Sequence, residues 1–257
     1  WEEYRFGMVR EDTQTSFSGE TVLDPEGRVV IQPELPDFRE GLMTGNLIVQ
    51  LTDVSGQTVT EHFPITRHSS DYYLGVRELS AVQRVGQPLN LKVVAVRPDG
   101  KVHSVEVSVK AALSRVKWHS VKIKGAGGGV RYQNKRRFIP VGTARFKTVA
   151  REANDIETGL RPLMAGQYRL AVSAQDGAGR SVVTQLDFYV SGKQSLAWDY
   201  SNEFKMDLVP DQEVYATGGT ARILLKAPFS GRALVTVERE KVLRTFQVDL
   251  KGNAPVI

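Results

Sequence analysis

Apolar and polar residues alternate along most of the chain, which is the period of a half-buried β-strand. The longest alternating row joins Val182, Thr184, Leu186, Phe188 and Val190. Shorter rows occur at 47–51, 89–95, 105–109 and 168–172. Helical periodicity is weak, so the pattern predicts an all-β protein.

Turn motifs separate these rows. Asp and Asn side chains hydrogen-bond to their own backbone, and Gly accepts a positive φ, so such motifs predict hairpin turns. They read DPEG at 24–27, DVSG at 53–56, RPDG at 97–100 and DGAG at 176–179. Short strands joined by such turns are typical of antiparallel β-sandwiches.

The chain also repeats itself, which indicates tandem domains. In the pair 44–63 and 165–188, a Gly precedes an alternating strand, an Asp/Gly turn and a second strand that ends in Phe. In the pair 82–96 and 214–228, a Gly lies two or three residues ahead of an apolar strand. We interpret the second pair as the opening hairpin and the first pair as the closing hairpin of one repeated unit.

Because the middle unit alone contains both hairpins, the sequence predicts a complete sandwich between two incomplete ones. Linkers are expected near 66–71 and 190–195. The middle unit is longer than the usual sandwich of about 100 residues, and alternation fails at about 115–154, so we expect a basic, Gly-rich hairpin insertion there. The predicted divisions are 1–69 for the C-terminal part of one sandwich, 70–192 for the complete one and 193–257 for the N-terminal part of the next.

Aromatic residues mark two further positions. Trp1, Tyr4 and Phe6 alternate on one face of the first predicted strand, so we expect them in the core of the incomplete first sandwich. Trp198 and Tyr200 follow the second predicted linker, where they would pack adjacent domains together.

The predicted insertion contains WHSVKIKGAGGGVRYQNKRR, in which a Gly-rich tip at 125–129 separates two basic, aromatic arms. Nucleic-acid sites mix such residues, but strands also carry Lys and Arg on their solvent face, where charge discourages edge-to-edge pairing. We favour a solvent-exposed hairpin. The alternatives are a contact with another domain or partner protein, and an anionic ligand such as nucleic acid or lipid headgroups.

The candidate contact residues lie in these arms. The basic residues are Lys110, Arg115, Lys117, Lys122, Lys124, Arg131, Lys135, Arg136 and Arg137. The candidates for a partner or interdomain contact are Trp118, Lys122, Lys124, Arg131, Tyr132, Lys135, Arg136 and Arg137. We expect no nucleic-acid partner, because a net charge of +5 is only a mild excess.

No constellation of catalytic residues is visible. The chain has no cysteine, and its four histidines lack metal-ligand spacing. No nucleophile elbow occurs, and GAGGG lacks the Gly-Lys-Ser/Thr ending of a phosphate loop. We therefore predict no catalytic residue, no metal and no cofactor; an enzyme would need a cofactor or metal from outside this segment.

The tail YATGGTARILLKAPFSGRALVTVEREKVL, residues 215–243, resembles the start of the bait-region domain in bacterial alpha-2-macroglobulins. That pattern is Tyr-x-x-Gly-x-x-Ala, a strand, Pro-Phe and a second strand. The matching residues are Tyr215, Gly218, Ala221, Pro228, Phe229, Ala233, Leu234, Val235, Thr236, Val237, Glu238 and Arg239. YRFG at 4–7 and AGQYRLAV at 165–172 are similar to the preceding macroglobulin-like domains.

The resemblance implies tandem macroglobulin-like sandwiches, of the immunoglobulin or fibronectin-III kind, in a periplasmic or cell-envelope protein. Such proteins trap proteases after bait cleavage, and many bond to them through a Cys-Gln thioester. Without cysteine this segment holds no thioester. We expect a non-catalytic scaffold whose partners are the parent's other domains and, for the parent, proteases. The alternative is a tandem Ig-like adhesion or ligand-binding module.

Overall fold

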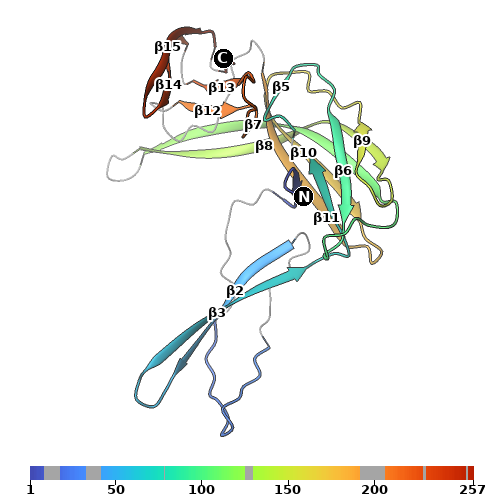
Figure 1. The fold of residues 1–257 in the computed structure, drawn as a ribbon, viewed down its shortest axis with the longest axis vertical. Coiled ribbons are helices and arrows are strands. Elements are labelled where there is room, and N and C mark those ends of the chain that lie inside the picture. Colours follow the sequence, from blue (N-terminus) through green and yellow to red (C-terminus); the bar gives the residue numbers. More distant parts are fainter. Residues whose placement is uncertain are drawn as a thin grey trace.

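The computed structural model describes residues 1–8, 18–32, 42–77, 79–124, 130–191, 206–227, 230–252 and 254–257. Every regular element in these ranges is a β-strand, which confirms the all-β prediction. Two sheets packed face to face form a central sandwich, a hairpin projects from one end, and a smaller strand-rich unit lies at the other (Figure 1).

The central sandwich has sheets of four and five strands. The smaller sheet has the order β1-β4-β6-β9, formed by Tyr4–Phe6, Tyr73–Arg77, Asn90–Val96 and Asn154–Glu157. The larger has the order β5-β11-β10-β7-β8, formed by Val82–Arg84, Ser181–Ser191, Gly166–Gln175, Ser108–Lys124 and Val130–Lys147. All pairings are antiparallel except the parallel pair of β5 and β11.

The core between the sheets is built from the alternating rows. Tyr168, Leu170 and Phe188 of the larger sheet are buried, as are Leu91 and Val93 of the smaller one. Tyr168 lies opposite Phe188 in register, and their rings stack with centroids 5.9 Å apart. Burial of each large apolar side chain contributes about 1.5–3 kcal/mol, so these rows supply most of the stability of the sandwich.

The first strand departs from the prediction. β1 pairs with β4 of the central sandwich, so Tyr4 and Phe6 do not belong to a separate unit of residues 1–69. Phe6 lies opposite Gly75, where a Cβ would come within 2.6 Å of its ring. Trp1 is half exposed and donates its indole N–H to the Gly100 carbonyl at 3.0 Å. Periodicity could not show this, because the pairing depends on a glycine distant in sequence leaving room for the ring.

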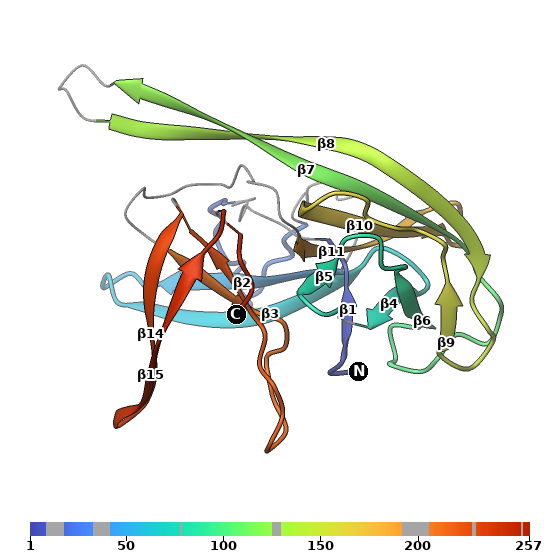
Figure 2. The same ribbon diagram turned by 90° about the horizontal axis from the view of Figure 1, so that it is seen from above.

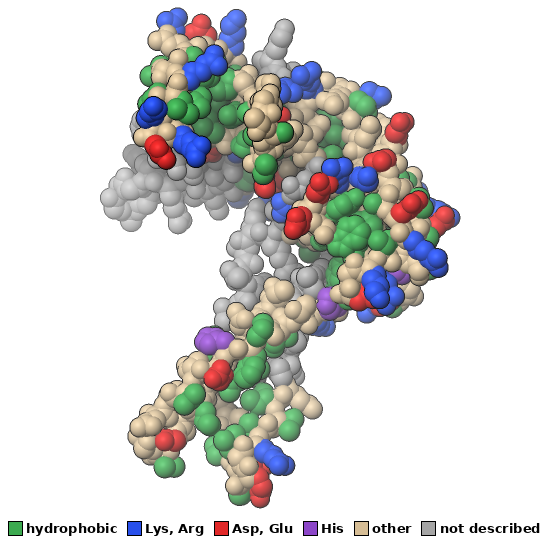
Figure 3. All heavy atoms as spheres, in the orientation of Figure 1, with side chains coloured by type: hydrophobic (Ala, Val, Ile, Leu, Met, Phe, Trp, Pro, Cys, Tyr) green, Lys and Arg blue, Asp and Glu red, His purple; other side chains and the backbone are tan. Residues whose placement is uncertain are grey.

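The hairpin of β2 (Leu42–Thr52) and β3 (Thr58–His68) projects from the sandwich, as Figures 1 and 3 show. Its register places Leu47 opposite Phe63 and Leu51 opposite Val59, so all four share one face. These side chains are 41–62% exposed. Within the described ranges, no second sheet covers this apolar face.

Two of the four predicted turns, at 53–56 and 176–179, join paired strands and have the same structure. The backbone N–H of Asp53 donates to the Gln57 carbonyl at 2.9 Å, and that of Asp176 donates to the Arg180 carbonyl at 3.0 Å. Each Asp carboxylate also accepts the N–H groups two and four residues further on. The predicted turn chemistry at 53–56 and 176–179 is thus confirmed.

The C-terminal unit consists of two strand pairs. β12 (Asp207–Pro210) pairs with β13 (Ile223–Lys226), and β14 (Gly231–Arg239) pairs with β15 (Lys241–Leu250). Leu224 and Ala254 pack with Val82 and Ala165 of the sandwich, which fixes one unit against the other. The predicted interdomain residues Trp198 and Tyr200, and Pro228 and Phe229 of the tail motif, lie outside the described residues.

Candidate partner-binding surface

The predicted insertion is a long two-stranded arm formed by β7 and β8. β10 pairs with β7 from Lys110 to Val116; beyond Val116, in the described residues, β7 and β8 pair with each other alone. Figure 2 shows the arm extending well past the sandwich. The hairpin starts at Ser108 and returns at Lys147, so its bounds differ from 115–154, because its first residues already belong to the core sheet.

Two side chains fix the arm where it leaves the sandwich. The indole N–H of Trp118 donates to Oε1 of Gln167 on β10 at 2.6 Å. Arg115 donates through Nη2 to the Ala165 carbonyl at 2.8 Å. At Gly166, whose φ is +147°, a Cβ would lie 3.0 Å from Arg115 Nε, so the glycine leaves room for this contact.

The face that carries Trp118 is already engaged with the sandwich. Phe138 lies on the same face, and the guanidinium groups of Arg136 and Arg169 are 5.4 and 5.0 Å from its ring centroid. Arg169 also forms a two-point ion pair with Asp187, at 2.6 and 2.7 Å. Trp118 and Phe138 therefore both have partners within the chain.

The opposite face of the arm carries three exposed cations and an exposed histidine. Lys117 lies opposite Arg137, and His119 lies opposite Lys135; all four are exposed. We call these four residues the cationic strip. Like charges directly opposite each other destabilise a sheet, and no ion pair to the strip is present among the described residues. The whole hairpin, residues 108–147, contains no Asp or Glu that could neutralise it.

All eight candidate contact residues lie in β7 or β8, but they do not form one surface. Trp118 and Arg136 share the engaged face, whereas Lys135 and Arg137 share the exposed one. Lys122 lies opposite Tyr132 in register; the side chains of Lys122, Lys124, Arg131 and Tyr132, and the tip 125–129, lie outside the description. A role in contact stays a prediction.

Sequence reasoning missed two residues that define the arm. Gln167 holds Trp118, and Phe138 receives two guanidinium groups. Strict alternation along the two strands would have separated the engaged face from the exposed one and pointed to His119 as a member of the strip.

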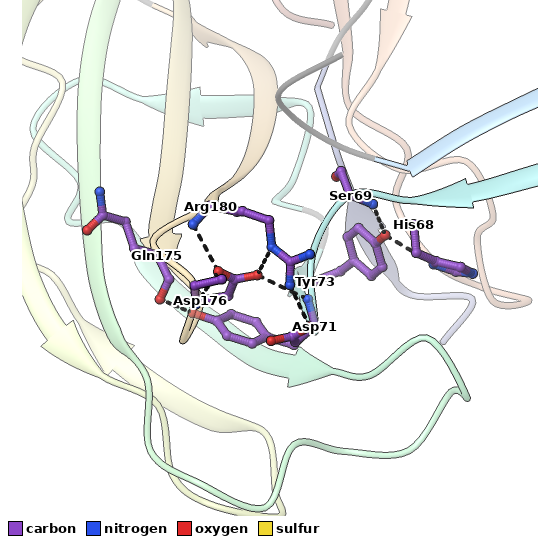
Figure 4. Close-up of polar contacts among 9 residues, drawn as sticks. His68, Ser69, Asp71, Tyr73, Gln175, Asp176 and Arg180 are labelled. Atoms are coloured by element: carbon purple, nitrogen blue, oxygen red, sulfur yellow. Dashed lines mark hydrogen bonds and ion pairs between the residues drawn. The ribbon is translucent and has the colours of Figure 1, made fainter. Parts of the chain in front are cut away.

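A second polar site joins the β2–β3 hairpin to the sandwich (Figure 4). Arg180 bridges two carboxylates, Asp176 at 2.7 Å and Asp71 at 2.5 Å. Asp176 also accepts the backbone N–H of Asp71 at 3.3 Å. The turn between β10 and β11 therefore binds the segment that follows the β2–β3 hairpin.

Tyrosines complete this joint, which coincides with the predicted linker at 66–71. The hydroxyl of Tyr73 is bonded to His68 Nδ1 at 3.0 Å and to the Ser69 N–H at 3.2 Å. The hydroxyl of Tyr72 donates to the Gln175 carbonyl at 2.7 Å. The sequence feature that could have predicted this joint is Asp176 of the DGAG turn, because its carboxylate accepts N–H groups both from its own turn and from the linker at Asp71.

The electrostatics of the joint follow from its hydrogen bonds. Burial alone would raise the pKa of Asp176, but N–H donors from Arg180, Asp71 and Ala178, with the Arg180 side chain, outweigh burial and lower that pKa. Burial, and then the charges of Asp176 and Asp71, raise the pKa of Tyr72 to about 12. Near neutral pH the joint therefore contains a carboxylate held by cationic and backbone donors, beside a neutral tyrosine.

Among the described residues, no group of His, Cys, Asp and Glu is arranged to hold a metal ion. In the same residues, no helix has the length and hydropathy needed to cross a membrane.

Comparisons with known proteins converge on one family. Residues 75–192 match the family model of bacterial macroglobulin domain 6. An alpha-2-macroglobulin homolog of Nostoc sp. is 24% identical over 100% of this chain and 14% of its own length. Alpha-2-macroglobulin of Pasteurella multocida is 24% identical over 87% of this chain and 12% of its own length. The chain thus spans a small part of these relatives.

Solved structures show the same fold. Native E. coli alpha-2-macroglobulin matches with a TM-score of 0.58 and 17% identity, over 100% of this chain and 17% of its own. Salmonella alpha-2-macroglobulin reacted with methylamine matches with a TM-score of 0.55 and 18% identity, over the same shares. Residues 75–192 thus match bacterial macroglobulin domain 6, and the chain as a whole is similar in sequence and fold to bacterial alpha-2-macroglobulins.

Proposed function

We propose that this chain is a non-catalytic scaffold segment of an alpha-2-macroglobulin-like protease inhibitor of the bacterial periplasm or cell envelope. The observation that carries the proposal is the match of residues 75–192 to bacterial macroglobulin domain 6. The chain covers only 11–14% of its curated relatives, so the bait region, any thioester and the protease contacts are assigned to other parts of the parent.

One solved relative supports protease trapping as the parent's activity. E. coli alpha-2-macroglobulin activated by porcine elastase matches with a TM-score of 0.57 and 13% identity, over 100% of this chain and 27% of its own. A protease acts on that protein. By analogy, the parent of this chain would respond to protease cleavage, and this segment would carry the resulting domain movement.

The contacts between units support a load-carrying scaffold. Arg180 and Asp71 tie the sandwich to the segment that follows β3. At the other end, the Ala81 N–H donates to the Asp211 carbonyl at 3.2 Å, and Lys226 Nζ lies 4.7 Å from the Tyr189 ring centroid. Units joined in this way move as rigid bodies about their interfaces, so a displacement at one end would reach the other.

We also propose that the outer units are completed by other parts of the parent, with the divisions 1–69, 70–192 and 193–257 modified by the transfer of β1 to the middle sandwich. Leu47 and Leu170 each lie six residues before the Asp of the same type of turn. Leu170 is 0% exposed beneath the opposite sheet, whereas Leu47 is 41% exposed. The apolar face of β2–β3 would therefore pack on a sheet from a neighbouring segment.

The test compares the parent protein with this chain alone. Each is incubated with elastase, and cleavage of casein is compared with cleavage of a small peptide substrate. An enclosing trap lowers cleavage of the large substrate and spares the small one, so the parent should show this split. This chain alone should change neither rate and form no adduct on a denaturing gel.

A parent that leaves casein cleavage unchanged would overturn the trapping proposal. Stoichiometric inhibition or a covalent adduct with this chain alone would overturn its assignment as scaffold.

A further inference from the structure

We propose that the cationic strip, formed by Lys117, His119, Lys135 and Arg137, docks the arm onto an anionic lipid surface through the headgroup phosphates. The proposal concerns where the molecule attaches, and it does not depend on protease trapping.

The charge of the chain is strongly segregated. Residues 108–147 contain 11 Lys and Arg and no Asp or Glu. The whole chain has 34 Lys and Arg and 29 Asp and Glu, so the remainder has 23 basic and 29 acidic residues, a net charge of −6. An anionic surface attracts the arm and repels the remainder, so it would orient the molecule with the arm towards the surface.

The arm extends past the sandwich as a two-stranded ribbon (Figure 2). Screening at physiological salt acts over about 8 Å, so acidic residues of the body that lie farther than this from the surface contribute little repulsion.

The face that carries the strip changes character where the sandwich ends. Along β7, Ala111 and Leu113 are buried against the opposite sheet, Arg115 is half-buried at the edge, and Lys117 is exposed. Beyond Val116 this face no longer has a core to fill. Cations there supply no packing, and the like-charge pair of Lys117 and Arg137 costs stability, which an anionic partner would relieve.

The spacing of the strip suits several phosphates at once. Residues two apart on a strand are about 7 Å apart, and residues directly opposite each other have Cβ atoms about 5 Å apart. The strip is thus a compact array that contains three cations on flexible side chains. A headgroup layer, whose phosphates move laterally, can match such an array without a fixed arrangement of partners.

Nucleic acid fits the described residues less well. Binding of single strands relies on aromatic rings that stack on bases. Trp118 is held by Gln167, and two guanidinium groups contact the ring of Phe138, so a base that stacked on either ring would have to compete with these contacts. Both rings also lie on the face opposite the strip.

The experiment measures co-sedimentation of the full chain with vesicles of phosphatidylcholine alone or with one-fifth phosphatidylglycerol, at 150 mM salt. The test variant is K117Q/K135Q/R137Q. The matched control, K101Q/R239Q/K241Q, removes the same number of exposed cations elsewhere and has the same net charge. Circular dichroism and thermal unfolding confirm that both variants are folded.

We expect the native chain to bind the anionic vesicles and not the neutral ones. The strip variant should bind on the order of a hundredfold more weakly, because each cation near the surface contributes about one factor of five, and the control should change several-fold at most. The exchange variant K117R/K135R/R137K should bind like the native chain, since point charges suffice.

Equal losses in the strip and control variants would refute a specific role for the strip. Failure of the native chain to bind anionic vesicles would overturn the proposal, as would tighter binding to duplex DNA or to polyglutamate at the same salt. A large loss in the exchange variant would indicate bidentate arginine recognition of a protein partner instead.

Discussion

The substitution Gly75→Ala tests the docking of β1 on the central sandwich. A Cβ at position 75 would lie 2.6 and 2.8 Å from two atoms of the Phe6 ring and 2.9 Å from Val94 Cγ1. Optimal carbon contacts are about 3.5–4.0 Å, so each neighbour would have to move by roughly 1 Å. Val94 is buried and has little room, whereas β1 has only three residues.

The least costly response is therefore detachment of β1. Overpacking of this kind costs about 1–3 kcal/mol, and we expect a loss of that size in the free energy of unfolding. The matched control is Gly45→Ala, where nothing lies within 4 Å of the new Cβ. Its cost should stay within about 0.5 kcal/mol.

Urea unfolding followed by circular dichroism measures both variants, alone and with Phe6→Ala. Removal of the ring relieves most of the clash, so Gly75→Ala should cost at least about 1 kcal/mol less in the Phe6→Ala background, a coupling typical of residues in contact. Equal costs in both backgrounds, or equal effects of the substitutions at 75 and 45, would refute the packing described for β1.

Two further predictions concern the joint and the arm. Because the pKa of Asp176 is lower in the folded chain than its unfolded value of about 3.9, its contribution to stability is present above that value and is lost as the pH falls through the folded pKa. Asp176→Asn should therefore lower the free energy of unfolding by roughly 1–2 kcal/mol at pH 7. It should also make that free energy decline less steeply below about pH 4. An unchanged decline at low pH, measured by urea unfolding, would contradict this. Limited trypsin digestion should cut the chain first between residues 122 and 137, because the arm is basic and its tip is Gly-rich. Mass spectrometry identifies the first cuts, and first cuts within β6 or β11 would show that the arm is protected.

The local sequence pattern was enough to predict the core strands and two hairpin turns. The rows at 89–95, 168–172 and 182–190 became the core because period-2 alternation places one face inside. The Asp53 and Asp176 turns followed from side chains that bond their own backbone. Both kinds of signal act over a few residues, so a single sequence contains them.

Contacts between distant segments could not be read in this way. The fit of Phe6 over Gly75, the bridge from Asp71 to Arg180 and the bond from Trp118 to Gln167 each join residues about 50 or more positions apart. Each depends on sheet order and register, which alternation leaves open. The arm was therefore predicted as a basic hairpin, but its division into an engaged face and an exposed face was not.

The central claim is that this chain is a scaffold segment whose outer hairpins are completed by other domains of a larger protein. Hydrogen–deuterium exchange of the β2–β3 hairpin tests it most directly, with the equivalent β10–β11 hairpin as internal standard. We predict that amides of β2–β3 exchange rapidly in this chain and at least a hundredfold more slowly in the parent, whereas those of β10–β11 are slow in both. Equal exchange of β2–β3 in the chain and in the parent would contradict the claim.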